Sequence, residues 1–288
     1  MSSGEDFDSQ KMGATRSYQP PSRPFAVWVT GFADHENRDS NLGFLDGRTS
    51  NTGGAIGGVD YTSNRVFSAQ DAFVFGVLSG FTDARIKSAD GLAKTDVSGP
   101  SVGVYGVYVS GGFSVDFNAK ADFLDVDQTS ILPTFSAGLT NYVTAANLNY
   151  KWYAPPSVGG WVEPTVGVVY TVSRWGDGQD ALDGHTIRVQ GGLRVGQSFN
   201  WGGVTIEPSL TGLLYSDVVI DGGTVAIVGL PVAPNDEGKL FEQAILKFNF
   251  DLGKGLSSYV EGDVRHGSLG SGREVVGAGG RVGVRYQW

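Results

Sequence analysis

The chain has 288 residues, of which 40% are hydrophobic and 18% are charged, with a formal net charge of −9 and no cysteine. This composition is too apolar for a disordered chain, excludes disulfides and thiolate metal sites, and disfavours nucleic acid as a partner because no basic patch offsets the negative charge. The 44 glycines and the aromatic content of 11% indicate many short strands joined by tight turns rather than helices.

Apolar and polar residues alternate along most of the chain, as they do in β-strands with two different faces. No stretch of about 18 uninterrupted apolar residues predicts a transmembrane helix. The alternation and the turn residues together predict twelve strands, at residues 25–34, 53–63, 70–83, 97–109, 112–124, 139–152, 161–173, 184–198, 203–216, 239–251, 255–265 and 274–288.

The segment GFSVDFNAKADF, residues 112–123, has one apolar face and one face of small or polar residues. If such polar faces packed against a second sheet, their charges would be buried, which is costly unless each is paired. In a closed barrel the charges line a wet lumen and the apolar faces meet lipid. We therefore predict an all-β fold, a single 12-stranded antiparallel transmembrane β-barrel of the outer-membrane type. The predicted lumen-facing residues are Asp116, Asn118, Lys120, Asp122, Arg188, Arg194, Lys247, Arg281 and Arg285.

The predicted connections alternate between long and short, which is typical of outer-membrane barrels. The long connections are 35–52, 84–96, 125–138, 174–183, 217–238 and 266–273, and the short ones are 64–69, 110–111, 153–160, 199–202 and 252–254. An even number of strands then places both termini on the periplasmic side of a Gram-negative outer membrane, with the long loops extracellular. Near the predicted periplasmic end, where such rings favour the membrane interface, lie Trp28, Trp152, Trp161, Trp201 and Trp288.

Six motifs follow one another along the chain: WVTGFADHEN (28–37), GGAIGGVDYTSN (53–64), FGVLSGF (75–81), VGVYGVYVSGGFSVDF (102–117), GLRVGQ (192–197) and GVRYQW (283–288). Together they resemble the translocator domain of autotransporters over about residues 25–288. The resemblance implies type V secretion, in which an outer-membrane barrel supports the export of an N-terminal passenger polypeptide and is inserted by the barrel-assembly machinery. It divides the chain into a flexible or lumen-occupying linker, residues 1–24, and a barrel domain, residues 25–288.

The resemblance also implies roles for individual residues. The family carries an assembly signal on its last strand, which here falls on Val282, Val284, Tyr286 and Trp288. Gly31 matches the family's glycine in the first strand, where the missing side chain lets an aromatic ring from a neighbouring strand pack against the backbone.

Two features depart from the family pattern. The chain ends in Trp288, where the family most often has Phe. The family also has a helix that threads the pore next to the barrel, whereas Pro20, Pro21 and Pro24 exclude a helix at that place.

Other functions fit parts of the sequence. A stand-alone outer-membrane porin is the main alternative, and a third is a surface protein that binds a partner through residues 35–52 and 217–238. The predicted outer loops are acidic, and divalent cations bound to their carboxylates could connect them to lipopolysaccharide. The barrel wall is expected to contact outer-membrane lipid. Three histidines, His35, His185 and His266, have acids or a serine nearby in the sequence, but the motifs of outer-membrane proteases and phospholipases are missing. We predict no catalytic residue, no cofactor and no metal site.

Overall fold

The structure is a computed structural model that describes residues 23–39, 47–130, 134–155, 159–176, 178, 183–222, 226–227, 230–231, 240–269 and 273–288. The long strands are β1 (Phe25–Arg38), β2 (Arg48–Asn64), β3 (Asp71–Ser88), β4 (Ala93–Ser110), β5 (Phe113–Ser130), β6 (Phe135–Tyr150), β8 (Gly160–Trp175), β9 (Gly184–Gln197), β11 (Val204–Gly222), β14 (Phe241–Gly253), β15 (Leu256–Leu269) and β16 (Arg273–Gln287). Short strands are β7 (Trp152–Tyr153), β10 (Phe199–Trp201), β12 (Ala226–Ile227) and β13 (Leu230–Pro231). None of the described residues forms a helix long and apolar enough to cross a membrane.

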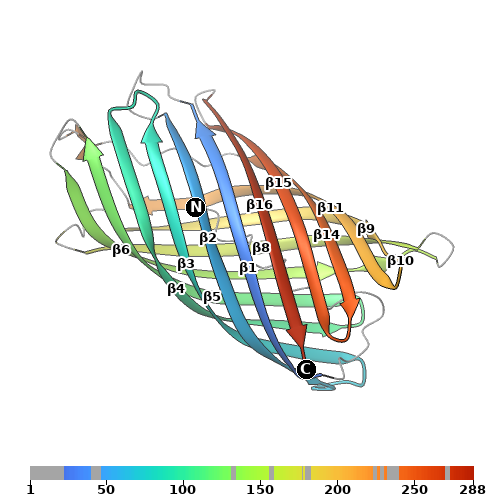
Figure 1. The fold of residues 1–288 in the computed structure, drawn as a ribbon. Helices are drawn as coiled ribbons and strands as arrows, with labels where there is room; N and C mark the ends of the chain where they lie inside the picture. The colour runs from blue at the N-terminus through green and yellow to red at the C-terminus, as the bar shows by residue number, and fades with distance from the viewer. Residues whose placement is uncertain are drawn as a thin grey trace.

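The long strands form one closed antiparallel barrel, in which each strand pairs with the next long strand of the sequence (Figure 1). The last strand returns to the first: β16 pairs with β1 from Gln287 opposite Ala26 to Val275 opposite Arg38. Closure matters because a bilayer offers no water to unpaired backbone groups, so a sheet crosses it only as a barrel without edges. The predicted 12-stranded antiparallel barrel is confirmed.

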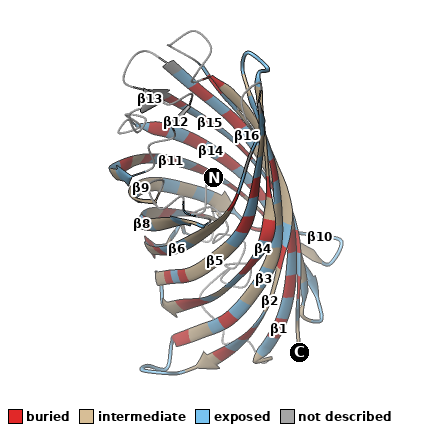
Figure 2. Cartoon of the chain, turned by 90° about the vertical axis from the view of Figure 1, so that its left-hand side faces the viewer, coloured by how far each residue is buried: buried red, intermediate tan, exposed pale blue. Residues whose placement is uncertain are grey.

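Exposed and buried residues alternate along the strands in the reverse of the soluble-protein pattern (Figure 2). Val29 and Val282 on the outer face are both 55% exposed, whereas Asp116 and Arg285 on the inner face are 1% and 5% exposed. Apolar residues gain nothing from contact with water. An outer wall of exposed valine, leucine and phenylalanine around charged residues therefore indicates a barrel surrounded by lipid.

The pattern reverses near one end of the barrel. We call the end that holds residues 25 and 287 the terminal end, and the opposite end the far end. On the outer face of β3 and β5, Phe81 and Phe123 are followed by the exposed acids Asp83 and Asp125. On the inner face at the same level, an apolar cluster is formed by Ala84, Val97, Leu124 and Val126, with Ile86, Leu139 and Trp175 packed against it. The sheet has left the lipid here, and it buries apolar residues inside as a soluble sheet does.

This reversal explains why several predicted strands are too short. Pairing continues past the apolar band to Arg38 opposite Arg48, and to Lys87 opposite Lys94, because ladder hydrogen bonds form equally well in water. The predicted sorting of connection length by end is therefore wrong: the far-end connection 89–92 is short, while 151–159 at the terminal end is longer.

The tryptophans fall into two groups. Trp152, Trp201 and Trp288 are exposed on the outer side near the terminal end, where the membrane interface favours them. Trp28 and Trp161 are buried on the inner face. The predicted interface position is therefore wrong for these two, because the alternation of faces along β1 and β8 points their side chains into the barrel.

Asp71 organises the turn between β2 and β3 at the terminal end. Its carboxylate accepts hydrogen bonds from the backbone amides of Val66 (2.7 Å), Phe67 (2.9 Å) and Ser68 (2.8 Å), and from the Tyr108 hydroxyl (3.1 Å). Burial alone would raise the pKa of Asp71, but these donors favour the charged form and hold the pKa below its usual value.

Replacing Phe117 by Arg tests the assignment of the faces. Phe117 is exposed on the outer face of β5, and an arginine near the bilayer midplane costs about 2–4 kcal/mol. We expect a drop of this size in the free energy of unfolding, measured by guanidinium titration in phospholipid vesicles. Thr129→Arg, on the same face of β5 but beyond the apolar band, is the control and should change little. Equal losses in both variants would contradict the position of the lipid band.

Replacing Asp71 by Asn tests the turn. The pKa is lowered on folding, so the stabilisation is fully present above the ordinary aspartate pKa of about 3.9 and is lost as the pH falls through the lower folded value. We expect faster amide exchange at residues 66–68 in Asp71→Asn, and no acid-dependent loss of protection, measured by mass spectrometry. Exchange at Leu92, whose amide donates to Asp90 in another turn, should not change. Identical exchange at residues 66–68 in both proteins would rule out this role for Asp71.

Candidate functional site

Buried polar side chains connect non-adjacent strands on the inner wall near the terminal end. Arg285 of β16 donates hydrogen bonds of 2.6 and 2.5 Å to both carboxylate oxygens of Asp60 of β2. Tyr105 of β4 donates to the same carboxylate at 2.8 Å, and Trp28 of β1 donates from Nε1 to the Tyr105 hydroxyl at 2.5 Å. Since β1 separates β16 from β2, and β3 separates β2 from β4, these bonds fix four strands relative to one another.

Other inward cations are paired with carboxylates on neighbouring strands. Lys247 of β14 and Arg281 of β16 approach Glu261 of β15 from both sides, at 3.3 and 3.2 Å. Arg194 of β9 lies 3.0 Å from Glu163 of β8. Each charge thus has a nearby opposite charge, which is what a buried ion needs to offset its lost hydration.

Arg188 of β9 forms a bidentate pair with Asp217 of β11. Its Nε and Nη2 donate to the two carboxylate oxygens at 2.8 and 3.0 Å. The guanidinium also lies 4.5 Å from the centre of the Tyr215 ring, in the geometry of a cation–π contact. This pair holds two adjacent strands together and crosses no third strand.

The four residues predicted on β5 lie on its inner face: Asp116, Asn118, Lys120 and Asp122. Asp116 accepts hydrogen bonds from Asn147 at 2.7 Å and from Asn149 at 3.0 Å. Lys120 lies 3.2 Å from Asp122. The inner wall of β5 therefore changes from acidic to mixed charge toward the far end, before it becomes apolar.

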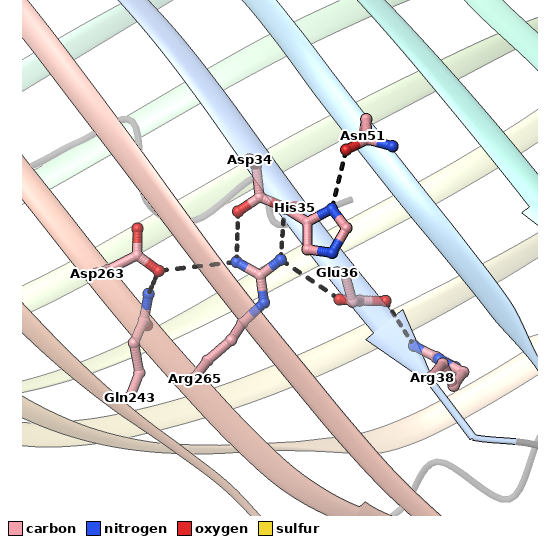
Figure 3. Close-up of polar contacts among 8 residues, drawn as sticks. All are labelled: Asp34, His35, Glu36, Arg38, Asn51, Gln243, Asp263 and Arg265. Carbon is pink, nitrogen blue, oxygen red and sulfur yellow. Dashed lines mark hydrogen bonds and ion pairs between the residues drawn. The ribbon is translucent and has the colours of Figure 1, made fainter.

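Arg265 of β15 is surrounded by carboxylates nearer the far end (Figure 3). It donates from Nη1 and Nη2 to Asp34 of β1 at 2.7 and 2.6 Å, and Glu36 and Asp263 lie 3.4 and 3.7 Å away. Gln243 of β14 donates to Asp263 at 3.2 Å. The cluster thus joins β1, β14 and β15 on the inner wall.

The sequence did not predict this cluster, because the first strand was expected to end at residue 34 and the long connection 35–52 to begin directly after it. Asp34 and Glu36 share the parity of Thr30, which is buried on the inner face. Continuing the alternation past residue 34 would have placed them inside. Nothing in the sequence, however, indicates that Arg265 is their partner, since the residues are joined only by closure of the barrel.

A cavity of about 170 Å³ lies inside the barrel toward the far end, and charged side chains of both signs contribute to its lining. The cations are Arg48, Lys120, Arg265 and Arg281, and the anions are Asp34, Glu36 and Asp122. Hydroxyl and amide groups from β2, β3, β6 and β8 complete the polar part of the lining. The polar part of the lining thus carries both signs of charge, and an apolar part is formed by Phe32, Ala84, Ile86, Leu124 and Val143.

His35 and His185 lack the partners that sequence proximity suggested. His35 is exposed on the outer face and hydrogen-bonds Asn51 at 2.9 Å, while its sequence neighbours Asp34 and Glu36 point inward to Arg265. His185 lies 3.8 Å from Asp221 rather than near Asp183. The side chain of Ser268, the sequence neighbour of His266, lies outside the described residues. Strand geometry separates adjacent residues onto opposite faces.

Asp183 has a structural contact instead. Its carboxylate accepts a hydrogen bond from the Trp175 amide at 2.7 Å and from Arg174 at 2.8 Å, and these donors lower its pKa.

Among the residues that the structure describes, no group of three histidine, aspartate or glutamate side chains is placed to hold a metal ion.

The residues of the predicted assembly signal share the outer face of β16. Val282, Val284, Tyr286 and Trp288 are all exposed there. Tyr286 stacks on Trp288 with ring centres 6.1 Å apart, and Trp288 stacks on Phe25 of β1 at 6.3 Å. An aromatic cluster therefore covers the outside of the seam between the first and last strands.

Gly31 lies on the outer face of β1 without the expected aromatic ring. A Cβ atom at Gly31 would meet only the backbone oxygen of Gly54, at 4.0 Å. Rings pack on other glycines: on the inner face Tyr259 covers Gly283 and Tyr105 covers Gly76, and on the outer face Phe117 covers Gly106. The predicted ring is missing at Gly31 because the residues opposite it on β16 and β2 are Val282 and Ala55.

The autotransporter beta-domain family matches residues 27–264. This chain belongs to that family. No curated protein sequence matches the chain. The match covers β1 through most of β15, and it includes Asp34, Asp60 and the inward residues of β5. The resemblance seen in the sequence motifs is thus confirmed.

Solved autotransporter barrels share the fold of this autotransporter β-domain. The beta domain of the Bordetella autotransporter BrkA is 16% identical, with a TM-score of 0.73 over 92% of this chain and 100% of that one. The transport unit of AIDA-I from Escherichia coli is 14% identical, with a TM-score of 0.64 over 98% and 96%. The translocator domain of NalP from Neisseria meningitidis is 10% identical, with a TM-score of 0.64 over 99% and 94%.

The Asp60–Arg285 pair gives a test of the inner wall of this β-domain. Arg285→Met leaves Asp60 as a buried charge without its bidentate partner, which costs about 3–5 kcal/mol. We expect a loss of this size in the free energy of unfolding in phospholipid vesicles. The control is Arg174→Met, which removes an exposed pair with Asp183 and should have little effect because water already screens that pair. A loss no larger than that of the control would mean that the inner pair does not stabilise the barrel.

Proposed function

We propose that this barrel is the translocator unit of an autotransporter and supports the export of an N-terminal passenger polypeptide across an outer membrane. The observation that carries the proposal is the closed barrel wall whose inward charges of both signs are paired with one another. Membership in the autotransporter β-domain family supports the same role. The proposed mechanism is physical, and it assigns no catalytic step to the barrel.

The paired charges suit a passage rather than a binding site. A polar chain segment that passes Glu261 or Glu163 meets a carboxylate already neutralised by lysine or arginine. Long-lived ion pairs with the passing chain would require breaking these internal pairs. A barrel of this strand number is narrow, so the passing chain is extended or at most one helix wide.

The orientation and the partners are part of the proposal. We place the terminal end in the periplasm and the far end outside the cell, where the charged outer face of β3 and β5 meets lipopolysaccharide and water. The barrel-assembly machinery reads the outer face of β16 at Val282, Val284, Tyr286 and Trp288. Residues 1–24 connect the passenger to the barrel; all but Arg23 and Pro24 lie outside the described residues.

An epitope placed before residue 1, behind a bacterial signal peptide, tests the proposal. We expect the epitope to reach the cell surface in Escherichia coli, where external protease removes it from intact cells. A signal-peptide fusion of the epitope to residues 1–24 alone is the control and should stay protected. If the barrel assembles but the epitope stays in the periplasm, the export function is wrong. A steady open conductance of that same protein in planar bilayers would then identify a porin.

A further inference from the structure

The inner face of the closing strand β16 is unusually bare. Its inward positions include Gly277, Gly279 and Gly283, which stand between a residue of β15 on one side and a residue of β1 on the other. Gly277 lies between Arg265 and Glu36, and Gly279 lies between Asp263 and Asp34. Side chains of β15 and β1 can therefore meet directly above β16.

Two contacts use this space. The Arg265 guanidinium reaches across β16 to form its bidentate pair with Asp34, with bonds of 2.7 and 2.6 Å (Figure 3). Further along the seam, the Tyr259 hydroxyl donates to Thr30 at 3.0 Å. A Cβ atom at Gly277 would lie 2.6 Å from Arg265 Nε, and one at Gly279 would lie 2.5 Å from an Asp263 oxygen and 2.9 Å from an Asp34 oxygen. A side chain at either position would therefore have to displace the atoms that make the crossing.

The seam needs a device of this kind because nothing local sets its register. Within a hairpin such as β15–β16, the connecting turn fixes which residues face each other. Strands β1 and β16 are joined by no turn. Across the lipid band, their outer faces carry small or apolar residues, which would still face outward after a shift of two residues. The outer faces therefore do not define the register, and weakly patterned, glycine-rich strands are prone to such slippage. A two-residue shift keeps every side chain on its own face.

We propose that the Arg265–Asp34 ion pair, beside the Arg285–Asp60 pair that also spans the seam, prevents the β15–β16 hairpin from closing on β1 in the register shifted toward Arg38. A shift of two residues moves Arg265 by about 7 Å along the strand direction. In one direction it brings Arg265 level with Arg38, a like charge, in place of Glu36, and takes the guanidinium away from Asp34. In the other direction Arg265 comes level with Asp34 itself and keeps a carboxylate partner. The cost of leaving a buried charge unpaired thus selects against closure in the register shifted toward Arg38. The inference concerns closure of the barrel and does not depend on the export function.

Cysteine pairs measure the register directly, because the chain has no cysteine of its own. Val29 lies opposite Val284 in the structure, while Val282 and Tyr286 are offset from it by two residues in either direction. A disulfide requires Cα atoms within about 7 Å, so a Val29Cys–Val284Cys bond reports the native register. Val29Cys paired with Val282Cys or Tyr286Cys reports a shifted one. The full chain is folded in vesicles, oxidised, and analysed by mass spectrometry.

In the parent protein we expect the native pair to cross-link and the offset pairs to remain reduced. In Arg265→Met we expect a several-fold rise in cross-linking of Val29Cys with Tyr286Cys, the pair that reports the shift toward Arg38, with a matching loss at the native pair. Arg188→Met is the control, since it breaks another bidentate inner pair that joins adjacent strands away from the seam. If Arg265→Met keeps the parent pattern, the proposal is wrong.

Two further variants keep the proposal testable if Arg265→Met does not fold. Asp34→Asn removes the other charge of the pair and should show the same offset cross-links. Gly279→Ala places a methyl group in the crossing and should also give offset cross-links. Gly280→Ala is its control, because Gly280 lies on the outer face and a Cβ there would be 3.6 Å from the nearest atom, the Glu261 backbone oxygen. This variant should keep the native cross-link. Native cross-linking alone in both Asp34→Asn and Gly279→Ala would overturn the proposal.

Discussion

The pairing of β1 with β16 is the constraint on which the rest of the barrel depends. In lipid every backbone donor and acceptor needs a partner from the protein, so the first and last strands, which are more than 200 residues apart in sequence, have to find each other. The other strand pairs are formed between neighbours in the sequence and are guided by their turns. The seam alone is formed by long-range recognition, and Arg265 and Arg285 reach across it in bidentate pairs with Asp34 and Asp60.

The interior follows from the same closure. Once the apolar residues face lipid, alternation places the charged residues inside, where they have to pair with one another. Arg285 with Asp60, and Lys247 and Arg281 with Glu261, satisfy this need with partners from different strands. The wall that results is polar and mixed in sign, and these ion pairs join its strands. They make it a structural core for the barrel.

Alternation alone predicted the barrel and the inner face of β5, because a period of two assigns each residue of a strand to one face. It did not predict the partner of any inner charge, since Arg265 and Asp34 meet only after the ring closes. Trp28 was misplaced because its residue type suggested the interface while its parity placed it inside. The far ends of the strands were not predicted for a different reason. After Phe81 and Phe123 the outer face changes from apolar to charged, and the predicted strands end near this change although the pairing continues.

The reversal of pattern at the far end gives one chain two kinds of stability. Where β3 to β6 leave the lipid, the cluster around Leu124 and Val126 is buried inside the barrel, so burial of apolar surface from water holds this rim together. The lipid-embedded band also has an inner apolar cluster, formed by Trp28, Ile56 and Tyr105, but its outer apolar residues face the membrane. The mouth at the far end therefore depends on its inner cluster and on strand pairing, whereas the band below it is also held by its contact with lipid.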